Sequence, residues 1–198
     1  MEQFDGTRET ALTAAIDWIL EDIIMPECEG MDKPPVRITI GWPKGSRGAR
    51  KIMATCHPRA HSSDGHNEIF VSPTVGDSLL ILESVVHEAI HAMDDCASGH
   101  RGFFARTARR VGLEGKFTET VAGDELKEAL QWWLDENGAI PVAAMDDSKR
   151  KKQGTRLLLI NCAAECGFKV RASSKVVRLW MEGETFCPAC GAQLMFNV

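Results

Sequence analysis

Apolar residues recur at helical spacing in four parts of the chain, and apolar and polar residues alternate in three others. The periodic segments predict helices over residues 7–24, 77–96, 101–111 and 124–135, with Pro and Gly residues close behind the first and last. The alternating segments predict strands at 36–40, 51–55 and 68–71, with a turn at 43–48 and a polar loop at 57–67. These elements mix helices with short strands, so we expect an α+β fold.

The pattern changes after residue 145. Residues 145–154 are charged and poor in apolar side chains, as expected for a linker, and short strands with cysteine turns are predicted from Thr155 onward. We therefore predict one domain over residues 1–148, followed by a basic linker and a small cysteine-rich module over 149–198.

Residues 87–91 of the longest predicted helix read His87-Glu88-Ala89-Ile90-His91. Two histidines at i and i+4 lie one above the other on a helix, so both rings can bind one metal ion. Glu88 then lies beside the metal, where it can take a proton from the attacking water and deliver it to the leaving group. The motif indicates a catalytic zinc site, and the alternatives are a structural metal or a chance match.

The helical wheel supports a metal site. At roughly 100° per residue, His87 and His91 fall roughly 150° from the centre of the helix's apolar stripe. This stripe consists of Leu79, Leu82, Val85, Val86, Ala89, Ile90 and Met93. The two histidines thus face away from the main packing surface, which suits the wall of a cleft better than a core.

A hydrolytic zinc site needs a third protein ligand. His100 is the preferred candidate, because Gly99 can break the helix and return the chain beneath the metal. The metzincin pattern is excluded, because it requires a histidine where this chain has Ala97. The other candidates for the third ligand are Glu114, Glu119, His57, His61 and His66.

His87-Glu88-x-x-His91 followed by Gly99-His100-x-Gly102-x-Phe104 resembles the SprT-like zinc metallopeptidases, which include the Spartan-type proteases of DNA–protein crosslinks. The resemblance covers roughly residues 35–115 and the cysteine-rich tail. It implies a zincin-like domain, a small sheet packed on helices with the motif helix, and a zinc ribbon behind it. It also implies His100 as the third ligand, although Arg101 separates His100 from the glycine that often follows directly in this family.

Three further roles near the site are expected from the sequence. Asn67 to Ser72 is our candidate edge strand for pairing with substrate, with an interior strand as the alternative. The oxyanion needs a donor, and in this chain without tyrosine the choice lies among Arg101, His57, His61, His66 and a backbone N–H. Asp94 either orients a ligand from behind or is an ordinary exposed acid.

Four cysteines near the C-terminus, Cys162, Cys166, Cys187 and Cys190, form two close pairs separated by 20 residues. Such pairs can hold one tetrahedral structural zinc, and Gly191 suits the tight turn beneath it. Without its metal, so small a module would hardly fold. Cys28, Cys56 and Cys96 are expected to be small buried residues.

Charge is distributed unevenly between the two parts. Residues 1–148 carry 14 basic and 25 acidic residues, a balance of −11, whereas residues 149–198 carry 9 basic and 3 acidic residues, a balance of +6; together they give −5. A basic tail favours an anionic partner such as DNA, and the alternative is a solvated linker around residues 149–152. Basic and aromatic side chains of the tail point the same way, unless the aromatics only form its small core. These residues are Lys169, Arg171, Lys175, Arg178, Phe168, Trp180 and Phe186.

The sequence shows no secretory signal and no apolar run long enough to cross a bilayer, so we expect a cytoplasmic protein without a membrane partner. The predicted function is zinc-dependent endopeptidase activity on protein substrates, with DNA-associated or DNA-crosslinked proteins as one class. It requires two zinc ions, one catalytic and one structural. The rival predictions are a regulatory protease with one dedicated partner, and a nucleic-acid- or protein-binding module whose zinc is not catalytic.

Overall fold

The computed structural model describes residues 2–43, 52–146 and 157–196. By its internal contacts the chain divides into two compact units, residues 1–148 and 149–198. Most of the predicted turn at 43–48, Lys51 and the basic run at 149–152 lie outside the described residues. The strand predicted at 51–55 begins only at Ala54 and runs to His57.

The N-terminal unit begins with a helix whose first turn is capped by Thr7, which accepts a hydrogen bond from the Thr10 N–H at 3.2 Å. The helical segment predicted over 7–24 is confirmed, and it comprises α1 (Arg8–Trp18) and the π-helical η1 (Ile19–Ile24). A short 3₁₀ turn, η2 (Met25–Glu27), follows. Apolar residues of α1 and η1 are almost fully buried, so this segment forms one wall of the core.

A three-stranded sheet follows in the order β1-β3-β2. Its strands are β1 (Val36–Ile40), β2 (Ala54–His57) and β3 (Asn67–Val71), and the 3₁₀ turn η3 (Arg59–His61) follows β2. β3 pairs in parallel with β1 and antiparallel with β2. The prediction that residues 67–72 form an edge strand is therefore wrong, because β3 has a hydrogen-bonded neighbour on each side.

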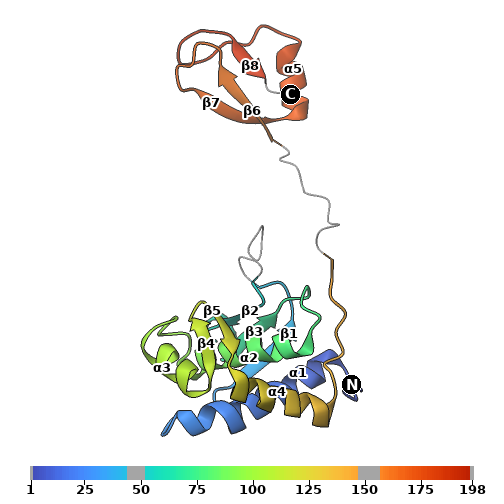
Figure 1. Cartoon of the computed structure of the whole chain (residues 1–198). Helices are drawn as coiled ribbons and strands as arrows, with labels where there is room; N and C mark the ends of the chain where they lie inside the picture. Colours follow the sequence, from blue (N-terminus) through green and yellow to red (C-terminus); the bar gives the residue numbers. More distant parts are fainter. Residues whose placement is uncertain (1, 44–51, 147–156, 197–198) are drawn as a thin grey trace. The chain divides into compact units, whose positions relative to one another are not determined.

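The predicted motif helix is α2 (Ser78–Met93), capped by Asp77, which accepts from the Leu80 N–H at 3.0 Å. It is followed by α3 (Gly102–Arg110), the hairpin β4 (Leu113–Lys116) and β5 (Glu119–Ala122), and α4 (Asp124–Asn137). All three helices were predicted, whereas the hairpin was not. Figure 1 shows α2 inside the N-terminal unit, with the hairpin and α4 packed beside it.

α2 is the central element of this core. Ile81, Leu82, Val85, Val86, Ala89 and Ile90 are fully buried, and α2 contacts α1, η1, α3, α4, β2, β3 and β5. Burial at about 25 cal/mol per Å² of apolar surface makes this packing the main source of stability in the unit. His87 and His91 are thus carried by a helix against which many elements of the unit pack.

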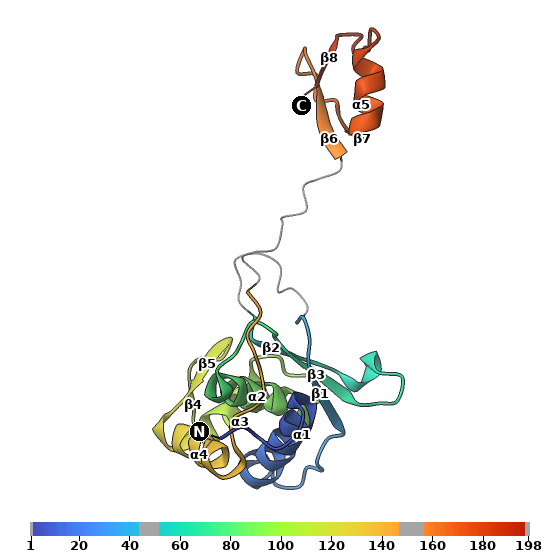
Figure 2. The same ribbon diagram turned by 90° about the vertical axis from the view of Figure 1, so that its right-hand side faces the viewer.

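The C-terminal unit has a three-stranded antiparallel sheet and one helix (Figure 2). The elements are β6 (Leu157–Cys162), β7 (Lys169–Ser173), α5 (Ser174–Met181) and β8 (Leu194–Phe196), with the strand order β7-β6-β8. Sequence analysis expected only strands and turns here, so α5 is a correction. Ser173 caps α5 by accepting from the Val176 N–H at 3.4 Å.

The described residues form a mixed α/β protein with five α-helices and small sheets. None of the helices in the described ranges has the length and apolar character needed to cross a membrane.

Candidate functional site

Three histidine rings meet at the C-terminal half of α2. His100 Nε2 lies 3.2 Å from His87 Nε2 and 3.3 Å from His91 Nε2. Three nitrogens bound to one tetrahedral zinc at about 2.0–2.1 Å would lie about 3.3–3.4 Å apart. The spacing of these nitrogens therefore matches three ligands around one metal ion, and the chemistry of three imidazoles suits zinc.

The turn after α2 places His100 against the helix. Gly99 adopts φ +53°, in the left-handed region, and nothing lies within 4 Å of where its Cβ would be. The predicted helix break at Gly99 is wrong in position, because α2 already ends at Met93; Gly99 lies in the turn between α2 and His100 and enters the left-handed region without a steric penalty. Asp95 (φ 55°) and Cys96 (φ 62°) also adopt positive φ, and the Cys96 N–H donates to the His91 carbonyl at 2.7 Å. The backbone of the turn is thus tied to a ligand residue.

Phe104 from α3 covers the three rings. It is fully buried, and its ring centroid lies 4.3 Å from that of His91, 4.7 Å from His87 and 5.1 Å from His100. The prediction that His87 and His91 face away from the apolar stripe was made from the helical wheel of α2, without the elements that pack on it. In the folded unit an aromatic side chain covers that second face, which restricts the motion of the ligands and keeps bulk water from that side.

Thr120 holds His87 from behind. Its hydroxyl lies 2.8 Å from His87 Nδ1, the nitrogen that does not face the other histidines. A hydrogen bond at Nδ1 fixes the orientation of the ring and leaves Nε2 for a metal. Sequence analysis missed this residue, because a threonine in a short strand carries no distinctive signal.

Burial keeps the three imidazoles neutral. Together with the neighbouring histidines, it lowers the pKa of His87 to about 3 and that of His91 to about 4. Burial also lowers the pKa of His100. Neutral imidazoles have the free lone pair that metal binding requires.

Glu88 follows His87 on α2 and is almost completely buried. Burial raises the pKa of its carboxyl to about 7, although a hydrogen bond from the backbone of Cys56 opposes the rise. A carboxyl with a pKa near neutrality can both accept and release a proton, as a general base and acid must.

The other candidates for the third ligand lie elsewhere. Glu114 and Glu119 are exposed on the hairpin, and neither belongs to the group of ring nitrogens that lie within 4.8 Å of one another. His57 and His61 lie next to each other, with their Nδ1 atoms 3.4 Å apart. Within the described part of the chain, the structure thus assembles His87, His91 and His100 and no other histidine with them.

Asp94 does not contact a ligand histidine through any observed hydrogen bond. Its Oδ2 accepts from the Ser98 N–H at 3.0 Å, so it stabilises the turn that leads to His100. Asp95 accepts from the Arg59 N–H at 2.7 Å and from Asn67 Nδ2 at 2.9 Å. The suggested ligand-orienting role of Asp94 is therefore replaced by a role in shaping the turn.

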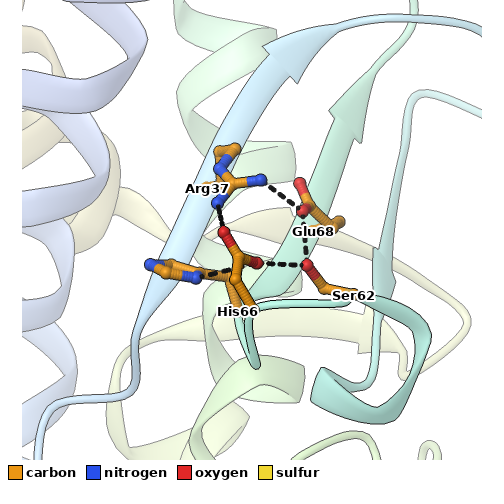
Figure 3. A network of polar contacts seen from close by, with 5 residues as sticks. Arg37, Ser62, His66 and Glu68 are labelled. Atoms are coloured by element: carbon orange, nitrogen blue, oxygen red, sulfur yellow. Dashed lines mark hydrogen bonds and ion pairs between the residues drawn. The ribbon is translucent and has the colours of Figure 1, made fainter.

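His66, the residue just before β3, belongs to a surface network of polar side chains (Figure 3). Its Nδ1 lies 3.2 Å from Asp64, and Arg37 contacts both Asp64 and Glu68. Ser62 Oγ lies 2.6 Å from Asp64 and 3.0 Å from Glu68. This network joins the loop to β1 and β3, so His66 contributes to the loop rather than to the metal centre. Arg101, another candidate oxyanion donor, is exposed at the start of α3.

The four cysteines of the C-terminal unit form a second group. Cys162 Sγ lies 3.4 Å from Cys190 Sγ, Cys166 Sγ lies 3.5 Å from Cys187 Sγ, and all four sulfurs lie within 4.8 Å of one another. Four thiolates around one zinc at about 2.3 Å would be about 3.8 Å apart. The two cysteine pairs predicted from the sequence are therefore brought together. Each of the two close sulfur contacts joins one cysteine of the first pair to one cysteine of the second.

The first cysteine pair provides hydrogen bonds that favour a thiolate. Although burial raises the pKa of Cys162, the backbone N–H groups of Cys166 and Ala164 and the Cys190 thiol lower it to about 6. Thiolates are the form that binds zinc. In the second pair Gly191 adopts φ +74°, the left-handed conformation expected for a tight turn at this position.

The charged and aromatic residues of this unit divide into two sets. Lys169, Arg171, Lys175 and Arg178 are all exposed, the first two on β7 and the last two on α5. Phe168 and Trp180 pack against the small core, as the alternative explanation for the aromatics held. Phe186 is 54% exposed. The unit thus exposes all four basic residues but only one of the three aromatic residues.

Comparison of the chain with protein-family models, with curated proteins and with solved structures finds no match.

Proposed function

We propose that the N-terminal unit is a zinc-dependent endopeptidase with a zincin-like, SprT-type site. The observation that carries the proposal is the meeting of three Nε2 atoms from His87, His91 and His100, together with the burial of Glu88, the residue that follows His87 on α2. Three protein ligands leave one position of a tetrahedral zinc open, as catalytic zinc sites do. A purely structural zinc would have a fourth protein ligand, and no such group joins the three histidines among the described residues.

Each residue of the site has a defined task. Zinc held by the three histidines would polarise the scissile carbonyl and lower the pKa of an attacking water. Glu88 takes the proton of that water and passes it to the departing amine. Thr120 keeps the His87 ring in place, and Phe104 packs against all three rings.

The edge strand β2 is the proposed place for a substrate peptide. β2 pairs with β3 on one side, it is at the edge of the sheet, and it packs on α2. An extended peptide can pair with such an edge through its backbone, which favours unfolded or flexible protein segments over rigid ones. This strand replaces the segment at 67–72, which is interior.

The C-terminal unit is proposed to hold a structural zinc through its four cysteines and to bind DNA through its basic surface. Support for DNA comes from the exposed positions of Lys169, Arg171, Lys175 and Arg178 and from the positive balance of residues 149–198. DNA-associated or crosslinked proteins are then the natural substrate class. A regulatory protease with a single protein partner is the second candidate, and stimulation of cleavage by DNA is the result that would exclude it.

Metal content tests the ligand set. We expect about two zinc ions per chain in the wild type and about one in His100→Ala, because one ligand of three is lost. His61→Ala is the matched control, since it removes an exposed histidine outside the group, and it should keep both ions. Two zinc ions in His100→Ala would contradict His100 as an essential ligand.

Glu88→Gln separates metal binding from chemistry. The variant should keep both zinc ions and cleave a protein substrate, either an unfolded one or one crosslinked to an oligonucleotide, about 10²–10⁴-fold more slowly. The reason is that an amide cannot accept the proton of the attacking water. Cleavage at the wild-type rate would refute the proposed role of Glu88.

A further inference from the structure

Two of the three cysteines outside the zinc ribbon lie face to face. Cys56 on β2 and Cys96 in the turn after α2 have their sulfurs 3.6 Å apart, although they are separated by 40 residues in the sequence. Both are half-buried, whereas Cys28 is buried, with 5% exposure. The expectation of three small buried residues therefore holds for Cys28 alone.

A metal site does not explain this pair. Within residues 2–43, 52–146 and 157–196, the groups of three or more possible ligands are the three histidines and the four ribbon cysteines. Cys56 and Cys96 thus have no third histidine, cysteine or carboxylate in reach, and two sulfurs alone do not hold a zinc ion. The chemistry left to two adjacent thiols is oxidation to a disulfide.

We propose that Cys56 and Cys96 form a reversible disulfide, with low-molecular-weight disulfides of the glutathione class as the oxidant. One protein thiolate attacks a sulfur of the oxidant and releases one small thiol, leaving a mixed disulfide on the protein. The second protein thiolate then attacks the protein sulfur of that mixed disulfide and releases the second small thiol. Two electrons pass from the protein to the oxidant, and the two thiol protons go to the released thiols.

The surroundings of the pair allow the bond to form. The sulfurs must approach by about 1.5 Å to reach a bond length of about 2.05 Å. Among the strands of the described ranges, β2 has a sheet neighbour only on its β3 side, so it can shift more easily than an interior strand. Partial exposure lets a small oxidant reach either sulfur, which is not the case for Cys28.

The two cysteines are joined through their backbones to the two parts of the proposed site. The backbone of Cys56 hydrogen-bonds the Glu88 carboxyl. The N–H of Cys96 donates to the His91 carbonyl at 2.7 Å. Closing the disulfide draws these two segments together and displaces Glu88 relative to the ligands. This consequence, unlike the disulfide itself, rests on the proposed peptidase function.

Peptide mapping of the zinc-loaded full chain tests the disulfide without any assay of activity. After equilibration with oxidised glutathione, we expect one crosslinked peptide pair containing Cys56 and Cys96, with a mass about 2 Da below the sum of the two thiol peptides. A dithiol reductant should reverse it. Cys28→Ser is the matched control and should give the same crosslink. Persistence of both cysteines as free thiols or as stable glutathione adducts would overturn the proposal.

Activity then tests the effect on the site. The oxidised wild type should cleave protein on the order of tenfold to a hundredfold more slowly than the reduced form, as expected for a displacement of about 1 Å. Cys96→Ser, which keeps the backbone N–H, should show no such response. A crosslinked protein of undiminished activity would overturn the coupling to the site. A protein that forms the crosslink but has no proteolytic activity when reduced would refute the peptidase function and leave the disulfide standing.

Discussion

The two units differ in how much apolar surface they bury around their candidate metal sites. In the N-terminal unit, helices α1, η1, α2, α3 and α4 and two sheets bury many large side chains, among them Phe104, Leu130 and Ile90 at 0% exposure. The described buried core of the C-terminal unit contains six residues, two of which are themselves candidate zinc ligands. They are Ile160, Cys162, Ala172, Val177, Cys187 and Leu194.

This difference separates two uses of a metal. A unit with its own core can hold three ligands in place without the ion, so the fourth position remains for a substrate or water. A unit with almost no core needs all four ligands for folding, and none is left for chemistry. The number of ligands in each group, three histidines against four cysteines, follows this division.

The largest expected effect is the unfolding of the C-terminal unit when one of its four clustered cysteines is replaced. In Cys190→Ser the C-terminal unit should unfold, because zinc binding contributes about 10–16 kcal/mol to folding in such modules. Amide signals of this unit should collapse in an NMR spectrum while those of the N-terminal unit stay. Ala189→Ser, in the same exposed turn, is the control and should leave both sets unchanged. A C-terminal unit that stays folded without zinc would contradict the claim that this unit needs a metal for folding.

The second prediction concerns the core of the N-terminal unit. Leu130→Ala on α4 should lower the free energy of unfolding of this unit by about 2–5 kcal/mol, because it leaves a cavity where a fully buried side chain contacts its neighbours. Glu128→Ala, exposed on the same helix, should change it by less than about 0.5 kcal/mol. Chemical denaturation followed by fluorescence measures both. Equal effects of the two substitutions would argue against a metal-independent core.

The third prediction concerns the hydrogen bond that Thr120 makes with His87, a support that the cysteine group of the C-terminal unit should not depend on. Thr120→Val removes the hydrogen bond to His87 Nδ1 and should weaken zinc binding at the histidine site by about 10–100-fold, with no loss at the ribbon. Competition with a chelator of known affinity measures the change. Thr118→Val, an exposed neighbour in the hairpin turn, is the matched control. An unchanged affinity in Thr120→Val would mean that the hydroxyl does not position the ring.

The smallest expected effect is at the surface network of the N-terminal unit. Hydrogen bonds from Ser62 and the charge of Arg37 hold the pKa of Asp64 well below its usual range. A carboxyl with a lowered folded-state pKa stabilises the fold above its unfolded pKa of about 3.9 and loses that contribution as the pH falls through the folded value.

Asp64→Asn should therefore lower Tm slightly at neutral pH, and the difference from wild type should shrink as the pH falls below about 4. The effect should be small because the carboxyl is exposed to solvent. Thermal melts between acid and neutral pH measure it, with exposed Asp22→Asn as the control. A gap that grows toward low pH would contradict the assigned pKa direction.

Much of the N-terminal unit was predictable because its elements are long and periodic. The helices around His87 and Leu130 follow from the apolar spacing, and β1 and β3 follow from alternation. The hairpin β4–β5 was missed, since it contains glycine and charged residues at 113–116 and has little alternation. α5 was missed because eight residues between cysteine turns give too short a pattern to distinguish helix from strand.

The sequence by itself determined which side chains of α2 share a face, because helical spacing is a local property. Its spacing also marked His87, His91 and the four C-terminal cysteines as candidate metal ligands. Only the tertiary structure decided that His100 rather than Glu114 or Glu119 joins His87 and His91. It alone placed β3 inside the sheet and Thr120 behind His87. It also brought Cys56 and Cys96 together across 40 residues. These are contacts between segments distant in the chain, and they depend on packing of the whole unit, which no local pattern encodes.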